Sequence, residues 1–207
     1  MKKYLALIGI VVGMLLMVSG CGEKDEVILT RGTWNGNQFT NEKAGVTFNL
    51  PEDWVVSTDE EMAAMLGSGT EILANSDLGY SEEEIKKSIE LTTIYDFIAA
   101  DSNGASNVMV IYENLKKQSS TRTMNEKKYI EFLSSQIEAA GMGYEVGEVS
   151  ELKIGDINYA TLTVTLSMGG ASLEQVYLVR RQGNYMINIL ITIMPESDLE
   201  TLVGYFE

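Results

Sequence analysis

Four consecutive segments near the C-terminus, rich in β-branched and aromatic residues, constrain the fold of this chain most. Short glycine-containing turns separate them: Gly155-Asp156, Gly169-Gly170 and Gly183-Asn184. Strands joined by such turns run in opposite directions, so the pattern predicts an antiparallel meander over residues 144–153, 157–167, 173–181 and 185–193. Every second residue from 185 to 193 is large and apolar, and we expect that face to be buried under a helix.

Four Ser/Thr-x-x-Glu sequences predict where helices begin. In this capping box the hydroxyl and the carboxylate each satisfy a backbone N–H of the first helical turn. Apolar residues at helical spacing follow each box. The boxes begin at Thr58, Ser81, Thr123 and Ser197.

Shorter segments predict further strands. Asn35-Gly36 is typical of a hairpin turn, a strand is expected over 46–50 up to Pro51, and a second hairpin is expected over 94–100 and 107–112. Strands and helices arrive in separate blocks, which is typical of an α+β fold. We expect an antiparallel sheet sandwiched by helices.

The first 21 residues carry a targeting pattern. Lys2 and Lys3 precede an apolar run over 4–17, and small residues then lead to Cys21, the only cysteine. The run is shorter than the roughly 20 residues that a membrane-spanning helix needs, so the pattern predicts a secretory signal peptide.

The sequence Val18-Ser19-Gly20-Cys21 resembles the lipobox of bacterial lipoprotein precursors, with valine in place of the commoner leucine. The resemblance implies cleavage between Gly20 and Cys21 and transfer of a diacylglyceryl group, with acyl chains such as palmitate, to the Cys21 thiol. We expect a signal peptide over 1–20, a lipidated cysteine with a short tether over 21–31, and a single α+β domain over 32–207. The protein would then be lipid-anchored at the extracytoplasmic face of the cell membrane. The alternative is an ordinary secretory signal followed by an accidental cysteine.

Composition narrows the classes of partner and chemistry. The chain has 15 basic and 30 acidic side chains and a formal net charge of −15 at pH 7. Such a chain is repelled by nucleic-acid phosphates and by anionic lipid headgroups, so neither is expected as a direct partner. There is no histidine, which removes the usual general base and the commonest metal ligand. With one cysteine, no internal disulfide is expected.

A second resemblance concerns the fold. Residues 36–39, Asn41, Gly45, the corner Leu50-Pro51-Glu52-Asp53-Trp54 and residues 107–115 look like a group of small uncharacterised lipoproteins of Gram-positive anaerobes. Their fold is similar to the PsbP-like fold of the photosystem II extrinsic subunit and of a Ran-binding nuclear import factor. The resemblance implies a non-enzymatic binding or assembly module, and it transfers no binding residue to this chain.

Patterns that could carry chemistry have simpler structural explanations. Met62-x-x-Met65 could be a thioether copper site but is more typical of a helix core. Asp101-Ser102-Asn103-Gly104 begins like a calcium loop but lacks the later acidic ligands. The carboxylates at 60–61 and 82–84 favour helix N-termini. A Ser–Lys pair with Lys116, Lys117 or Lys153 has no recognisable motif around it. We therefore predict no metal, no cofactor and no catalytic residue.

The expected function is a lipid-anchored binding or assembly module at the cell envelope, with an envelope protein or a small ligand as its unknown partner. The alternative is a small envelope hydrolase that uses a Ser–Lys or carboxylate site. A two-lobed solute receptor is disfavoured by the chain length. The candidate partner-binding residues are Trp34 and a basic cluster, Lys116, Lys117, Lys127 and Lys128.

Overall fold

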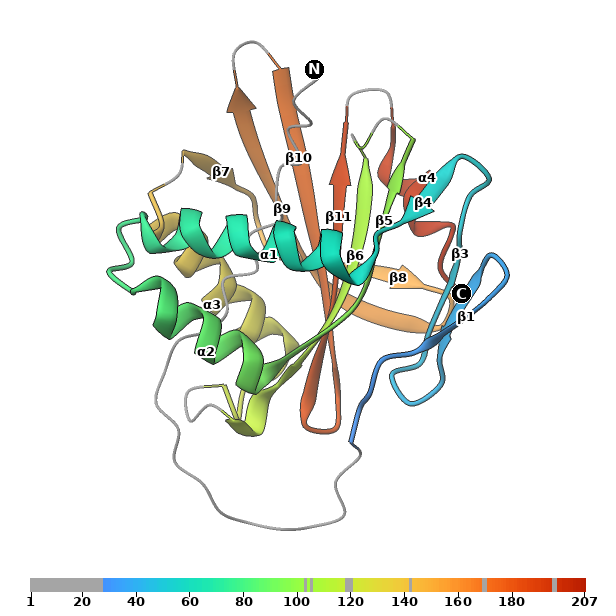
Figure 1. Cartoon of the computed structure of the whole chain (residues 1–207), viewed down its shortest axis with the longest axis horizontal. Helices are drawn as coiled ribbons and strands as arrows, with labels where there is room; N and C mark the ends of the chain where they lie inside the picture. The colour runs from blue at the N-terminus through green and yellow to red at the C-terminus, as the bar shows by residue number, and fades with distance from the viewer. Residues whose placement is uncertain are drawn as a thin grey trace.

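The computed structural model describes residues 28–102, 104, 106–117, 121–141, 143–168, 171–194 and 197–207. The predicted signal peptide, Gly20, Cys21 and most of the predicted tether lie outside these residues. The described part is an α+β fold with two antiparallel sheets and helices in separate blocks, as expected (Figure 1). Among the described residues, no helix has both the length and the apolar character that crossing a membrane requires.

An eight-stranded antiparallel sheet forms the centre of the molecule. Its strand order is β4-β5-β6-β11-β10-β9-β7, and β8 also pairs with β9. The strands are β4 (Trp54–Val56), β5 (Thr93–Asp101), β6 (Asn107–Asn114), β7 (Tyr144–Val146), β8 (Ser150–Ile154), β9 (Ile157–Met168), β10 (Ala171–Gln182) and β11 (Tyr185–Ile193).

The predicted meander is confirmed from β9 to β11, but its first segment is two short strands, β7 and β8. The break lies at Gly147, whose backbone N–H donates to the Thr163 carbonyl at 2.8 Å. A Cβ at position 147 would lie 2.9 Å from that carbonyl oxygen, so glycine permits this close approach. Both short strands still pair with β9.

A three-stranded sheet covers one face of the large sheet. It consists of β1 (Thr33–Asn35), β2 (Gln38–Asn41) and β3 (Val46–Asn49). The predicted β1–β2 hairpin is confirmed, with Gly36 in its turn at φ +60°. Phe39 and Phe48 pack on Phe97 of the large sheet, with ring centroids 4.6 and 5.1 Å apart from it.

The apolar face of β11 is buried, and the helix α4 (Leu199–Val203) contacts this strand, as the sequence predicted. Ile187, Ile189 and Ile191 are fully buried in the same cluster as the phenylalanines of the small sheet. The short helix α4 adds Leu202 to this cluster. The three-stranded sheet covers the same side of the large sheet, and the predicted sandwich between helices did not include it.

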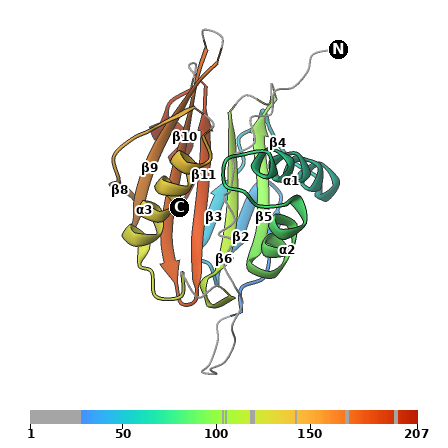
Figure 2. The same ribbon diagram turned by 90° about the vertical axis from the view of Figure 1, so that its left-hand side faces the viewer.

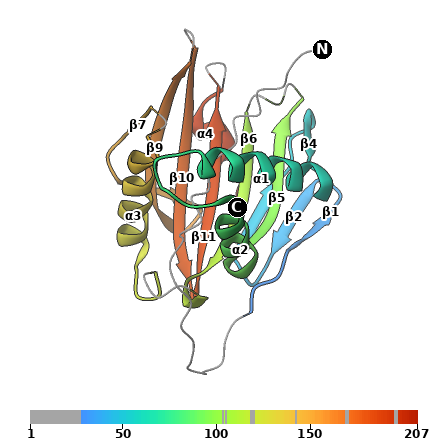
Figure 3. The same cartoon turned by 60° about the vertical axis from the view of Figure 1, so that its left-hand side comes forward.

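Three helices lie on the opposite face of the large sheet, as Figures 2 and 3 show. They are α1 (Asp59–Ala74), α2 (Glu82–Thr92) and α3 (Glu126–Ala139). Their apolar residues form a second core with the strand residues that point away from the small sheet, among them Ile111, Leu162 and Leu190. A 3-10 helix, η1 (Leu115–Lys117), follows β6.

Two of the four predicted capping boxes are confirmed, those at Thr58 and Ser81. Helix α3 instead has Asn125 as its N-cap, with the amide oxygen accepting from the Lys128 N–H at 3.0 Å. The box predicted from Thr123 fails because its Glu126 carboxylate accepts from the backbone N–H of Arg181.

The fourth box fails because Asp198 caps α4. Its carboxylate accepts from the Thr201 N–H at 2.8 Å. Ser197, the residue predicted for this role, has its hydroxyl 3.0 Å from that of Ser106. In both failed boxes a carboxylate or carboxamide oxygen close to the predicted hydroxyl acts as the cap, in agreement with the strong N-cap preference of Asp and Asn.

The domain begins earlier than residue 32. Leu29 is only 2% exposed and belongs to the core. The next residues are held by Asp96 of β5, whose carboxylate accepts from the Gly32 N–H at 2.7 Å. Asn41 and Tyr112 also donate to this carboxylate. The predicted tether therefore extends too far, since its last three residues belong to the folded domain.

Candidate functional site

The structure does not bring the candidate partner-binding residues together. Trp34 lies in β1, half-buried, with its ring 5.3 Å from the rings of both Phe39 and Phe97. This packing uses the indole to hold the small sheet against the large one. The lysines lie on the opposite, helix-covered face, in η1 and in the first turn of α3.

The four lysines do share one end of the molecule. Leu115 of η1 donates to the Asn184 carbonyl in the β10–β11 turn at 2.9 Å. The neighbouring Arg181 guanidinium donates to the carbonyls of Met124 and Arg122 at 2.8 and 3.3 Å, and so fixes the segment that enters α3. Lys117, Lys127 and Lys128 are exposed there.

A surface groove lies where the C-terminal ends of α1 and α3 meet. Its volume is about 560 Å³. We call it the helix-end groove, and it is lined by Ser68, Glu71, Ile72, Asn75, Ser76, Asp77, Ala140 and Gly141. Sequence reasoning missed it, because it depends on where two distant helices end.

Local hydrogen bonds fix the α1 side of the groove. Asn75 caps α1, with its side-chain amide donating to the Glu71 carbonyl at 2.9 Å. The Ser76 hydroxyl donates to the Leu73 carbonyl at 2.6 Å. On the α3 side, Gly141 has φ +65°, and a Cβ there would lie 2.6 Å from the Asp77 carboxylate. Helix α3 ends just before Gly141, and the absence of a side chain at this glycine leaves room for Asp77.

The groove is electrostatically negative. Each helix directs the negative end of its macrodipole toward it, and neither α1 nor α3 has a basic residue in its last turn. The exposed Glu71 and Asp77 add two carboxylates. Ile72, with 42% of its surface exposed, adds an apolar contact. This combination fits a ligand that carries an ammonium or guanidinium group beside an apolar part.

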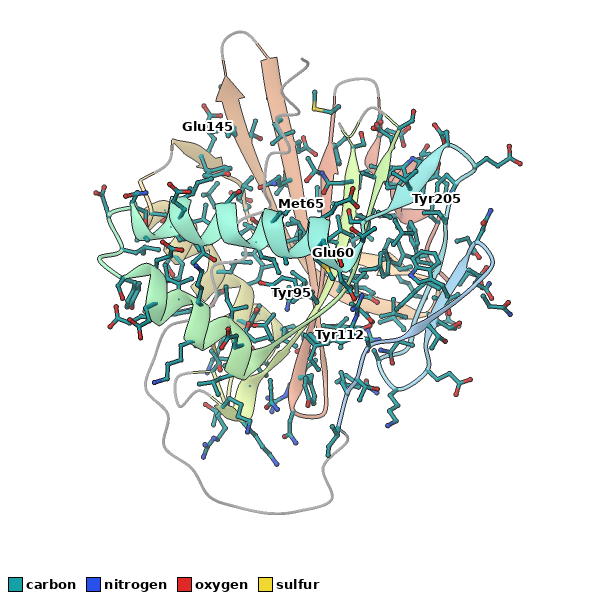
Figure 4. The ribbon with its side chains drawn as sticks, in the orientation of Figure 1. Glu60, Met65, Tyr95, Tyr112, Glu145 and Tyr205 are labelled. Carbon is teal, nitrogen blue, oxygen red and sulfur yellow. The ribbon has the colours of Figure 1, made fainter. Side chains whose placement is uncertain are left out.

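A second polar cluster is buried beneath α3. Glu113 of β6 is 3% exposed, and the Tyr129 hydroxyl donates to its Oε2 at 2.5 Å. Burial raises the pKa of Glu113 to about 7, although the hydrogen bond from Tyr129 opposes the shift. The other carboxylate oxygen and the buried Tyr95 hydroxyl have no hydrogen-bond partner among the described residues. Figure 4 shows Tyr95 near the middle of the molecule.

The weaker chemical patterns occupy structural positions. Met62 is buried and Met65 is half-buried in the core under the helices. Asp101 accepts from the Ser106 N–H at 3.1 Å within the β5–β6 turn. Lys153 pairs with Asp156 at 3.4 Å. Among the described residues, no group of three or more acidic side chains has an arrangement that could hold a metal ion.

Comparisons with known proteins find only distant likenesses. No protein-family model matches the chain, and no curated protein matches it in sequence. A crystal structure from Bacteroides thetaiotaomicron is similar with a TM-score of 0.46 and 13% identity, over 83% of this chain and 48% of that chain. This chain thus spans about half the length of the Bacteroides chain.

Two further structures are less similar. LpqN of Mycobacterium tuberculosis, described as involved in cell envelope biogenesis, has a TM-score of 0.39 and 10% identity, over 77% of this chain and 76% of that chain. PA94 of Pseudomonas aeruginosa, a protein of unknown function described as a putative regulator, has a TM-score of 0.27 and 16% identity, over 44% of this chain and 60% of that chain. At these TM-scores none of the three structures supports an inference about function.

Proposed function

We propose that this protein is anchored by a lipid on Cys21 to the extracytoplasmic face of the cell membrane and acts there as a non-enzymatic binding or assembly module. The helix-end groove is the observation that carries the binding role. Two helix C-termini and two carboxylates surround an exposed isoleucine, and such a site favours a cation attached to an apolar group. A basic side chain of an envelope protein or a small amine fits this description.

In this proposal the protein belongs to the group of small lipoproteins whose fold is similar to the PsbP-like fold. An antiparallel meander with α3 packed across β9 and β10 is the kind of arrangement that this resemblance implies. The small sheet on the other face is an addition to it. The anchor itself rests on the sequence Val18-Ser19-Gly20-Cys21.

Photocrosslinking in cells tests the groove. A photoreactive residue at Ile72 should capture a partner, whereas one at Val55, which is 62% exposed on the sheet edge, should not. The double variant Glu71→Lys, Asp77→Lys should lose the Ile72 adduct at unchanged melting temperature, because both carboxylates are on the surface. The same adduct from Val55, or an adduct that survives the charge reversal, would contradict the binding role of the groove.

Metabolic labelling with an alkyne fatty acid tests the anchor. The wild-type protein should be tagged and should sediment with membranes, and Cys21→Ser should abolish both. A diacylglyceryl group supplies the two chains that stable anchoring requires. Labelling that persists in Cys21→Ser would contradict the lipid anchor at Cys21. The photocrosslinking test of the groove would not be affected by that result.

A further inference from the structure

The described chain starts at the same end of the molecule where the lysines gather. The Lys43 ammonium lies 3.5 Å from the Ile28 carbonyl, and Gln182 donates to the Lys43 carbonyl at 3.4 Å. Figures 1 and 3 show the start of the described chain, the β10–β11 turn and η1 at one end of the structure. Ile28, the described residue nearest to Cys21 in the sequence, therefore lies at the end of the domain that carries the β10–β11 turn (Figure 1).

That end is basic although the chain as a whole is acidic. We call it the basic end, and it consists of Lys43, Lys116, Lys117, Arg122, Lys127, Lys128 and Arg181. Glu42 is next to Lys43 in the sequence, and the Glu126 carboxylate at this end accepts from the Arg181 N–H. Figure 4 shows nitrogen-tipped side chains at the lower end of the view.

Helix stability does not explain the lysines. Lys127 and Lys128 lie in the first turn of α3, where the positive end of the macrodipole disfavours cations. The first turns of α1 and α2 each carry three acidic residues instead. Asn125 already accepts from the Lys128 N–H, but the lysine ammonium groups and the positive end of the α3 macrodipole together complement an anion from outside the chain.

We propose that the basic end lies against the anionic lipid surface in which the Cys21 anchor is inserted, so that the anchored domain is held in one orientation. The inference rests on the proposed lipid anchor. Six residues, 22–27, lie between Cys21 and Ile28, so seven steps of about 3.5 Å along the chain give a span of at most about 25 Å. Basic groups kept so near a surface are attracted by its negative potential, which acts over about a Debye length.

This orientation places the helix-end groove away from the membrane. The lysines lie at the N-terminus of α3 and the groove at its C-terminus, and the helix has 14 residues. At 1.5 Å per residue the two ends are about 20 Å apart. The net charge alone predicts repulsion from anionic lipid. Because the charge is unevenly distributed, the basic end is attracted to anionic lipid, whereas the helix-end groove is repelled by it.

The test attaches the chain from Cys21 onward to a maleimide lipid in vesicles, so that it does not depend on acylation in cells. An azide-bearing residue replaces either Glu42 at the basic end or Asn75 at the groove, and a donor dye is coupled to it. Energy transfer to acceptor headgroups is then compared in vesicles with 30% phosphatidylglycerol and in pure phosphatidylcholine.

With phosphatidylglycerol at 50 mM salt, transfer from position 42 should exceed transfer from position 75 at least two-fold. The difference should disappear in phosphatidylcholine, in 0.5 M salt and in the triple variant Lys117→Glu, Lys127→Glu, Lys128→Glu. It should persist in the control Lys86→Glu, Lys87→Glu, Lys153→Glu, which changes the net charge equally. Equal transfer from both positions, a difference that persists in phosphatidylcholine, or equal loss in both triple variants would overturn the proposal.

Discussion

Glu113 should make the folded domain less stable as the pH rises toward neutrality. Burial raises its pKa from 4.5 to about 7, so the folded state binds this proton more tightly than the unfolded state. Between these two values the unfolded chain is ionised while the folded chain still carries the proton. The free energy of unfolding therefore falls with increasing pH across this window and levels off above the folded pKa.

The size of the effect follows from the shift. One pKa unit corresponds to about 1.4 kcal/mol, so a shift from 4.5 to about 7 lowers the free energy of unfolding by about 3 kcal/mol in total. Roughly 2.5 kcal/mol of this loss falls between pH 5 and pH 8. Glu113→Gln removes the proton equilibrium and keeps an amide oxygen to accept from Tyr129. The free energy of unfolding of this variant should therefore not show the fall between pH 5 and pH 8 that Glu113 causes.

Urea unfolding of the chain from residue 22 onward at pH 5 and pH 8 measures the difference. Other carboxylates also titrate, among them Asp96, whose pKa is raised chiefly by burial, but they are common to both proteins and cancel in the comparison. The exposed Glu145→Gln is the matched control and should retain the wild-type pH dependence. If Glu113→Gln loses as much stability between pH 5 and pH 8 as the wild type, the buried carboxyl is not the cause.

Four substitutions test the packing and the caps by the same unfolding assay. Asn125→Ala should cost about 1 kcal/mol and Thr123→Ala close to nothing, because Asn125 caps α3; the reverse order would contradict the observed cap. Ile189→Asp should cost several kcal/mol or prevent folding, since it places an unpaired charge in a fully buried site; wild-type melting would contradict this packing. Tyr112→Phe should cost about 1 to 3 kcal/mol because it takes a donor from the buried Asp96 carboxylate, and an unchanged midpoint would show that the bond contributes little.

Local signals were sufficient for the strands of the large sheet. From β9 to β11, apolar alternation and glycine turns lie within neighbouring residues, so pairing and facing could be predicted. The contribution of the small sheet to this core could not be predicted, because Phe39 and Phe48 are about 140 residues away from β11 in the chain and alternate as in any half-buried strand. An apolar face specifies that it must be covered without specifying by what.

The helix caps and the helix-end groove also show which features depend on neighbouring residues and which depend on distant ones. Thr58 and Ser81 cap their helices because the Glu61 and Glu84 carboxylates accept from their backbone N–H groups, whereas the Glu126 carboxylate accepts from the N–H of the distant Arg181. The helix-end groove had a local signal, the absence of basic residues from the last turns of α1 and α3. Only the tertiary arrangement brings those two ends together.

Several features that are unfavourable for folding lie along α3. Lysines occupy its N-terminal turn, Glu138 lies in its last turn, and Tyr129 packs its hydroxyl on the buried Glu113. The macrodipole disfavours the first two arrangements by about 0.3 to 1 kcal/mol each, and the third buries an acid. A chain shaped only by stability would reverse these charges. The charges along α3 are positive at the basic end and negative at the helix-end groove. The proposed anchored module needs this distribution, because one end would attract the membrane and the other a cationic partner.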